Sequence, residues 1–153
     1  MSGDRHAVRM IDVAEKPVTV RTARASARLR ARPETVARIR SGDLVKGDAL
    51  STARLAGIMA AKRTADIVPL CHPLPLDAVD VEIRFPTGDI VEVETRVRAT
   101  ARTGVEMEAL VAATAAVLAV YDMTKSIDPG MTIETVRLEE KTGGTRGDYL
   151  RGG

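Results

Sequence analysis

Two alternating segments joined by a short turn restrict the fold of this chain more than any other feature. In both, inward-facing positions alternate with charged ones, and the inward set is Val79, Val81, Ile83, Phe85, Val91, Val93, Thr95 and Val97. The turn sequence PTGD at 86–89 separates the two segments. Alternation with a period of two predicts strands, and a short glycine-containing link predicts that they pair antiparallel. The sequence therefore predicts a β-hairpin over 79–97 with one charged face.

Two further segments predict strands at either side of this hairpin in the sequence. From Ala23 to Ala31 the odd positions carry alanine or leucine, and the even positions carry arginine or serine. Alanine and arginine prefer helices, but the period of two favours a strand. After the helix-breaking DPG at 128–130, Ile133 to Leu138 predicts the last strand.

Three segments predict helices. Pro33 opens a short helix that Gly42 ends, and Asp48 caps a second helix that runs to about Arg63. The second helix is apolar nearly all round, so we expect it to be largely buried. The third spans 104–125, with Thr103 and Glu106 as an expected capping box.

The order β–α–α–β–β–α–β predicts an α+β fold with a ferredoxin-like, four-stranded antiparallel sheet and helices packed on one face. The length of 153 residues fits one domain. We expect a flexible N-terminal arm over 1–17, a single catalytic domain over 18–140, and a flexible Gly-rich tail over 141–153.

Composition excludes several classes of protein. No apolar run approaches the roughly 18 residues that a membrane helix needs, and no signal-like apolar segment follows Arg5 and Arg9, so we expect a cytoplasmic protein. The single cysteine, Cys71, excludes an internal disulfide, and two histidines leave too few ligands for a structural zinc site. A site for Mg²⁺ held by carboxylates stays open.

The charge is unevenly distributed along the chain. Residues 1–50 carry a net charge of +5 and residues 51–153 a net charge of −3, with arginines concentrated between Arg21 and Arg40. A solvated charged face is one interpretation, and a docking surface for an anion or for RNA is the other. The only aromatic residues are Phe85, Tyr121 and Tyr149, which argues against stacking on nucleic-acid bases.

Polar residues near the two ends of the third helix are candidates for chemistry. Lys125 lies in line with Met107 on the apolar stripe, and Asp122 lies about 60° from it, so an ion pair or a lysine tuned for proton transfer fits the pattern. Glu106 and Glu108 lie about 160° apart and cannot form a dyad. Glu108 and Asp122 are separated by about 21 Å of helix, so both can serve one small molecule only if subunits share the site.

Other candidates are weaker when taken one at a time. His72 and Cys71 lie in the proline-rich loop VPLCHPLPL at 68–76, and either a structural or a ligand-binding role fits them. Lys46 and Lys62 flank the second helix, where solvated side chains or phosphate contacts are the alternatives. Lys141 beside the paired glycines of KTGGTRGD offers a weak phosphate signal.

Six ordered motifs carry a resemblance over nearly the whole chain, from about MIDV at 10–13 to Asp148. The motifs are KGD at 46–48, TARLAGIMAAKRT at 52–64, VPLCHPL at 68–74, TGVEMEAL at 103–110, YDMTK at 121–125 and KTGGTRGD at 141–148. Together they resemble the cyclic pyranopterin monophosphate synthase family, the C protein of molybdenum cofactor biosynthesis. Six motifs with matching order and spacing are far more specific than a single short one.

The resemblance implies a reaction and an assembly. Family members convert 3′,8-cyclo-7,8-dihydroguanosine triphosphate to cyclic pyranopterin monophosphate and release pyrophosphate. It implies a ferredoxin-like homohexamer, a trimer of dimers with sites at the dimer interface. It implies no required cofactor and no metal centre, although Mg²⁺ bound with the triphosphate is compatible with it. The partners it implies are the cyclised GTP substrate and further copies of the chain, with no nucleic acid and no membrane.

The resemblance also implies roles for individual residues. Asp122 matches the catalytic aspartate, Lys125 a proton-transfer lysine, and Lys46 a second catalytic lysine. The substrate-binding positions that it implies are Leu70, Cys71, His72, Glu106, Met107, Glu108, Arg21, Lys62 and Lys141, of which Arg21, Lys62 and Lys141 are cations for the triphosphate. The resemblance also implies that the Gly-rich tail contributes to this site.

Two departures from the family pattern bear on activity. Arg102 stands where family members read lysine, and KTGGTRGD replaces KSGGKSGD. Arginine keeps the positive charge but does not transfer protons near neutral pH. The alternative function is therefore a nucleotide-binding module of the same fold that binds the triphosphate without converting it.

Overall fold

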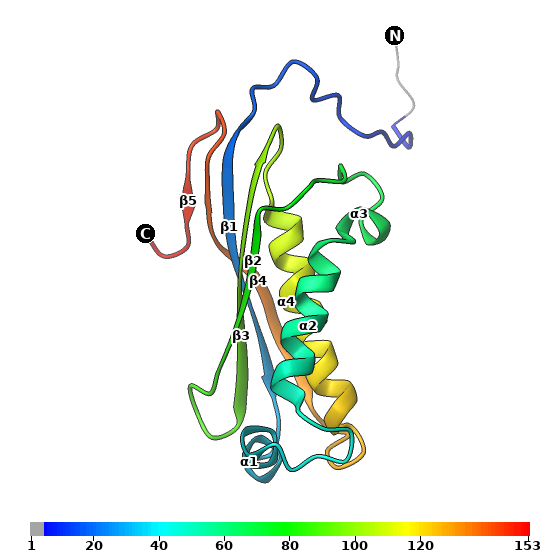
Figure 1. Ribbon diagram of the computed structural model, residues 1–153, viewed down its shortest axis with the longest axis vertical. Helices are drawn as coiled ribbons and strands as arrows, with labels where there is room; N and C mark the ends of the chain where they lie inside the picture. Colours follow the sequence, from blue (N-terminus) through cyan, green and yellow to red (C-terminus); the bar gives the residue numbers. More distant parts are fainter. Residues whose placement is uncertain (1–4) are drawn as a thin grey trace.

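A five-stranded antiparallel sheet with helices on one face makes up the body of the molecule, seen here in a computed structural model that describes residues 5–153 (Figure 1). The strands lie in the order β2-β3-β1-β4-β5. In chain order the elements are β1 (Thr19–Arg30), α1 (Pro33–Ser41), α2 (Ala49–Ala61), α3 (Thr64–Ile67), β2 (Ala78–Arg84), β3 (Ile90–Ala101), α4 (Glu106–Thr124), β4 (Thr132–Thr142) and β5 (Tyr149–Leu150).

The strand predicted from the period-two pattern is confirmed as the central strand β1, although its alanines and arginines prefer helices. It pairs with β3 from Thr19↔Ala101 to Arg30↔Ile90 and with β4 on its other side. Its inward side chains are fully or almost fully buried, and they are Ala23, Ala25, Ala27 and Leu29. Pairing on both sides and burial under α4 stabilise the strand by more than the small difference in intrinsic propensity.

The expected count of four strands is wrong, because the C-terminal segment adds a fifth. Strand β4 runs on to Thr142, past the expected boundary at 140/141. The chain then turns through 143–148, where Gly143, Gly144 and Gly147 adopt positive φ angles. Strand β5 pairs with Glu140 and Lys141, so the segment expected as a tail folds back on the free edge of β4.

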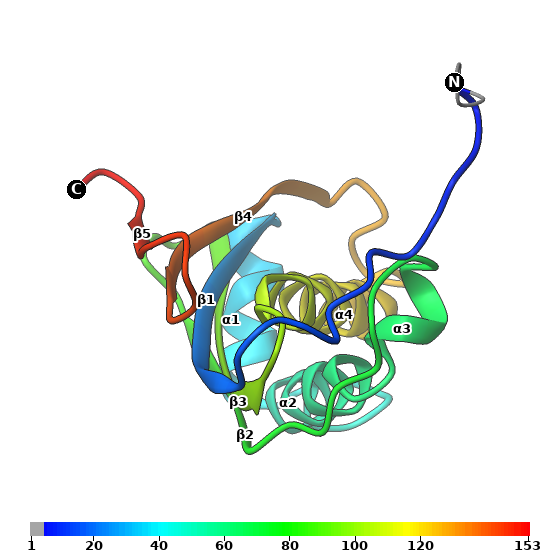
Figure 2. The ribbon, with the colours of Figure 1, turned by 90° about the horizontal axis from the view of Figure 1, so that it is seen from above.

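Helices α2 and α4 cover the apolar face of the sheet side by side (Figure 2). They approach closely at Gly57, where a Cβ atom would lie 3.1 Å from the Ala112 carbonyl oxygen and 3.0 Å from Val81 Cγ2. The expectation that α2 is largely buried is wrong, because Leu55 and Met59 are 58% and 47% exposed. The buried positions of this helix are all small, Ala49, Ala53, Gly57 and Ala61, while Leu50 and Ile58 pack partly buried against the core.

Helix α4 is the core helix of the molecule. Within residues 5–153 it is the one helix long and apolar enough to cross a membrane, which corrects the expectation that no such stretch exists. It packs against α2 and the sheet, and half of its apolar window is buried there, as in a soluble α+β fold. The expected capping box is also wrong: Val105 is the N-cap residue, and no side chain caps the helix.

The other face of the sheet is covered by paired charges. Arg24 reaches Glu140 at 3.3 Å and Glu94 at 3.6 Å, and Arg28 reaches Glu92 at 2.7 Å. Arg30 pairs with both Asp89 and Glu134. Three arginines of the stretch from Arg21 to Arg40 are therefore paired with acids of neighbouring strands and of the β2–β3 turn, which is consistent with a solvated charged face.

The chain before β1 forms an extended arm. The arm contains no helix or strand over residues 5–17, and its backbone turns at 5–6 and again at 14–15, where Lys16 N–H donates to the Val13 carbonyl (3.0 Å). It crosses above the start of α4 and leaves the molecule on the helix side of the sheet, past α4 and away from α2 (Figures 1 and 2). The expected flexible arm also includes residues 1–4, which lie outside the described residues.

Candidate active site

Three of the expected site residues meet at the C-terminal end of α4. Lys125 Nζ lies 2.8 Å from Asp122 Oδ1, and Lys46 Nζ lies 2.9 Å from Asp122 Oδ2. Lys46 also donates to the Asp122 backbone carbonyl at 3.4 Å. The loop between α1 and α2 brings Lys46 here from 76 residues away in the sequence. One carboxylate is thus held between two ammonium groups.

The two lysines fix the charge state of this cluster. Hydrogen bonds from Lys125 first and then from Lys46 lower the pKa of Asp122 to about 2. The same carboxylate raises the pKa of Lys125 above its ordinary value. All three side chains are more than half exposed, so burial does not tune the lysine. Of the two sequence interpretations the ion pair is the one observed, and it keeps Lys125 protonated and Asp122 ionised at neutral pH.

A second group of expected residues lies at the N-terminal end of α4. Glu108 is 2% exposed, and its Oε2 lies 3.8 Å from the Cys71 thiol. Its Oε1 is buried and has no hydrogen-bond partner among residues 5–153. A cavity of about 220 Å³ opens beside it, lined by Lys62 and the proline loop. A buried acceptor without a partner facing a cavity is a site where a ligand N–H or O–H can bind.

Burial also sets the protonation of this group. It raises the pKa of Glu108, and burial together with the adjacent Glu108 raises the pKa of the Cys71 thiol. A thiol with a raised pKa stays protonated at neutral pH and is a poor nucleophile. Cys71 therefore acts here as a hydrogen-bond donor to Glu108. His72 follows it in the loop and is partly buried, and Leu70 is 44% exposed.

Cations gather close to the same end of α4. Lys141 Nζ lies 3.9 Å from Glu106 Oε1, and Arg21 Nη2 donates to the Arg102 backbone carbonyl at 3.1 Å. The Arg21 guanidinium packs against Gly144 so closely that a Cβ atom at that position would overlap it. The sequence interpretation did not foresee the contact between Arg21 and Arg102. The pairing of β1 with β3 sets Arg21 opposite Ala99, so its side chain reaches Arg102 just after the end of β3, and no local pattern reveals that register.

One chain does not bring the two groups together. Figure 1 shows the start of α4 near α3 and its end near α1. Glu108, which Cys71 contacts, is in the first turn of α4, and Asp122, which Lys46 and Lys125 contact, is in its last turn. Met107 lies at the second end, 37% exposed on the outer side of the helix. The separation of about 21 Å along the helix axis is too large for one small molecule. Within residues 5–153, no group of three His, Cys, Asp or Glu side chains can hold a metal ion.

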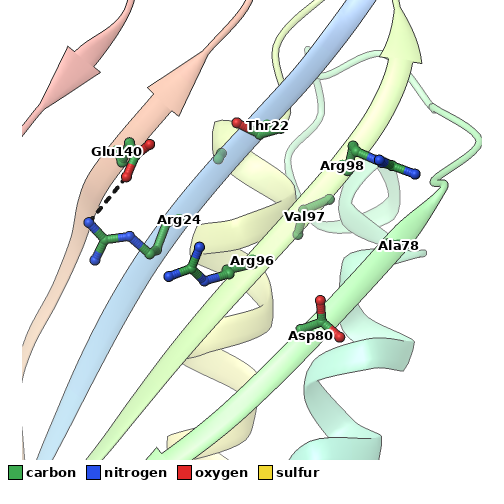
Figure 3. Close-up of a pocket in the computed structure, with 9 residues that line it drawn as sticks. Thr22, Arg24, Ala78, Asp80, Arg96, Val97, Arg98 and Glu140 are labelled. Atoms are coloured by element: carbon green, nitrogen blue, oxygen red, sulfur yellow. Dashed lines mark hydrogen bonds and ion pairs between the residues drawn. The ribbon is translucent and has the colours of Figure 1, made fainter.

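A further hollow of about 290 Å³ lies on the charged face of the sheet, away from both groups (Figure 3). Arg24, Arg96 and Arg98 line it together with Asp80 and Glu140. None of the expected site residues lines this hollow. Its arginines come from even positions of β1 and β3, the set that the period-two pattern assigns to the face without helices.

Comparison with known proteins identifies the family of the chain. A family model described as the MoaC family matches residues 10–144. A "Cyclic pyranopterin monophosphate synthase" of Thermomicrobium roseum is 54% identical over 97% of this chain and 90% of its own length. A protein of the same name from Herpetosiphon aurantiacus is 53% identical over 95% of this chain and 90% of its own.

A "Cyclic pyranopterin monophosphate synthase 2" of Mycobacterium tuberculosis is 52% identical over 97% of this chain and 88% of its own length. The family match includes both groups at the ends of α4, and these relatives align over almost the full chain. The chain belongs to the MoaC family.

Proposed function

We propose that this protein is a phosphorus–oxygen lyase that converts (8S)-3′,8-cyclo-7,8-dihydroguanosine 5′-triphosphate to cyclic pyranopterin monophosphate and pyrophosphate, an early step of molybdenum cofactor biosynthesis. The observation that carries the proposal is the Lys46–Asp122–Lys125 cluster, which holds one ionised carboxylate between two ammonium groups. Relatives that are more than half identical over nearly the whole chain bear the name of this activity.

The cluster suits the proton transfers that this reaction needs. Closing the cyclic phosphate forms a bond from a substrate hydroxyl to the α-phosphorus and breaks the bond to the pyrophosphate oxygen. The hydroxyl proton must be accepted, and the new charge on pyrophosphate must be balanced. In this proposal Asp122, ionised at neutral pH, accepts the proton of the substrate hydroxyl. Lys125 and Lys46 donate protons to the purine ring as it opens and closes.

The cations at the other end of α4 suit the triphosphate. In this proposal Arg21, Lys62 and Lys141 contact its phosphates, and the loop that follows Lys141 contributes to the site. Glu106 and Glu108, with Met107 and the segment Leu70–His72, hold the nucleoside part. The chain's own groups supply the acid, the base and the cations, so no cofactor is required, and Mg²⁺ accompanies the triphosphate only as its counterion.

A complete site requires a second copy of the chain. The outer side of the helix layer is apolar, with Leu118 56%, Leu55 58% and Met59 47% exposed. If two copies pack through this layer about a two-fold axis perpendicular to α4, their α4 helices run antiparallel. Asp122 of one copy then lies beside Glu108 of the partner subunit. We propose this dimer as the catalytic unit of a homohexamer, a trimer of dimers.

We also propose the finer description of the fold and its setting. The order β2-β3-β1-β4, with α2 before β2 and α4 before β4, supports a ferredoxin-like catalytic domain over 18–140 with β5 added at its edge. The protein acts in the cytoplasm and binds no membrane and no nucleic acid. Pairing of Arg24, Arg28 and Arg30 with strand carboxylates supports the last point.

The decisive experiment is turnover of the cyclised GTP substrate. The purified protein is incubated with enzymatically generated substrate, and pyrophosphate and the pterin product are followed by mass spectrometry. We expect both products together, and a loss of about 10²–10⁴-fold in rate with Lys125→Ala but none with the control Arg38→Ala. Saturable binding with the substrate left intact would instead establish the non-catalytic nucleotide-binding module.

A further inference from the structure

The N-terminal arm exposes apolar side chains that its own chain does not cover. Val8 is 79% exposed, Ile11 67%, Met10 52% and Val18 52%. Val13 is the one residue of the arm over 5–18 that is partly buried. Single exposed apolar residues are common on protein surfaces, but here four large ones stand within eleven positions of one extended segment, three of them within positions 8–11. Such a concentration of exposed apolar side chains favours a covering partner.

The direction of the arm indicates where that partner lies. Figure 2 shows the arm crossing above the start of α4 and leaving on the helix side of the sheet, past α4 and away from α2. The same side presents the exposed apolar residues Leu55, Met59 and Leu118. The arm therefore leaves past the α4 edge of the helix layer, and both the arm and this layer expose apolar side chains.

The reach of the arm is sufficient to contact another molecule. Residues 5–18 span up to about 45 Å when extended, about twice the separation between Glu108 and Asp122. In the two-fold arrangement proposed above, the end of α4 where the arm leaves lies beside the C-terminal end of α4 in the second copy. The arm can therefore pass over the cluster of Asp122 and Lys125 in that copy.

We infer that the arm of each copy packs on the helix layer of a second copy, with Met10 and Ile11 beside the C-terminal half of the partner's α4 and over the shared site. The inference rests on the proposed two-fold site, which it extends by naming the segment that closes it. Burial of Met10 and Ile11 stabilises the pair of copies. The arm also excludes water from the Asp122 cluster of the partner subunit, where proton transfer takes place.

Photo-crosslinking tests the contact directly. Met10 is replaced by a benzophenone amino acid in the full chain, which is irradiated and separated under denaturing conditions. We expect a product of twice the chain mass whose linked peptides join the arm to residues 114–125. A product of single-chain mass only, or a double-mass product linked elsewhere, would overturn the inference.

Two variants that introduce the same charge at different places test whether the arm contributes to association of the copies. Ile11→Asp places a charge in the arm, and Gly88→Asp places the same charge on the β2–β3 turn, where a new Cβ meets open space. Sedimentation should show association weakened about tenfold or more by Ile11→Asp, and circular dichroism should show both variants folded. Equal association of Ile11→Asp, Gly88→Asp and the unaltered chain would refute the arm contact.

Failure of the inference and failure of the proposed function are distinguishable in these experiments. If the unaltered chain turns over substrate while the crosslinks stay within one chain, the function stands and the arm contact is wrong. If arm crosslinks join two copies but no substrate is consumed, the arm contact stands and the synthase activity is wrong.

Discussion

At the scale of single residues, the charge state of Asp122 is the property on which the proposed chemistry depends. Its pKa of about 2 comes from hydrogen bonds with Lys125 and Lys46. We expect the carboxyl carbon of Asp122 to titrate near pH 2 by NMR in the unaltered chain. In the double variant Lys46→Met/Lys125→Met the midpoint should return toward 3.8, the ordinary value for aspartate. Added salt should raise the midpoint only in the unaltered chain, because the cluster is exposed.

The sign of the effect on stability follows from this shift. A carboxyl with a lowered pKa in the folded chain stabilises the fold above its unfolded value, and that contribution is lost as the pH falls toward 2. The unaltered chain should therefore lose more of its free energy of unfolding between pH 4 and pH 2 than the double variant does. Parallel losses in urea titrations at these two pH values would contradict the assignment.

The buried Glu108 carboxyl should behave in the opposite way. Its raised pKa means that the folded chain binds this proton more tightly than the unfolded chain, so stability falls as the pH rises above 4.5. Glu108→Gln removes the buried charge and should raise the free energy of unfolding at pH 7 by about 1–3 kcal/mol. The gain should shrink at pH 4. Glu106→Gln, at a partly exposed carboxyl, serves as the control and should change little at either pH.

At the scale of elements, the close packing of α2 on α4 depends on a missing side chain. A Cβ at Gly57 would meet the Ala112 carbonyl oxygen at 3.1 Å, and a branched side chain needs more room still. Gly57→Val should lower the free energy of unfolding by about 1–3 kcal/mol. Arg54→Val carries the same β-branched penalty at an exposed position of α2 and should cost well under 1 kcal/mol. Thermal unfolding of the two variants side by side measures the difference.

The elements that the sequence predicted correctly are those whose pattern is local. The hairpin of β2 and β3, the strand β1 and the Asp48 cap of α2 all follow from alternation or from a single capping residue. Strand β5 was missed, because its two residues are held by pairing with β4 and carry no periodicity. The outward face of α2 was misjudged, since hydrophobicity alone does not distinguish a buried side of a helix from an exposed one.

In the candidate site, too, local sequence pattern predicted the features that depend on it and missed those that depend on how distant segments fold together. The spacing along α4 correctly separated Glu108 from Asp122, because a helix has a fixed rise per residue. The approach of Lys46 to Asp122 depends on how the loop before α2 folds, so the motif resemblance indicated it and local pattern did not. The sequence left open whether Lys125 forms an ion pair or is tuned for proton transfer; the side chain pairs with Asp122 and reaches solvent, because the helix stripe ends where the chain leaves the core.

At the scale of the whole molecule, a site shared between copies predicts complementation between inactive variants. Asp122→Asn removes one half of the proposed site, and His72→Ala alters the other. Each variant alone should have very low turnover. Co-expression should restore up to about a quarter of the unaltered activity, because half of the dimers are mixed and each mixed dimer holds one intact site.

The matched control is co-expression of Asp122→Asn with Lys125→Ala. Both changes fall in the same half of the site, so no intact site can form in any dimer. Activity in the first mixture but not in the second supports the shared site. Equal, very low activity in both mixtures, with dimers still present, would show that each chain carries its own complete site.

The paired charges on the open face of the sheet have a consequence for behaviour at high temperature. Glu94 lies within 3.6 Å of Arg24, Arg84 and Arg96, so the face carries a linked network rather than isolated pairs. The hydration of charged groups becomes less favourable on heating, which lowers the cost of keeping such charges together. This face therefore contributes relatively more to holding β1, β2 and β3 in register as the protein warms, while the small alanine-rich core on the other side gains nothing comparable.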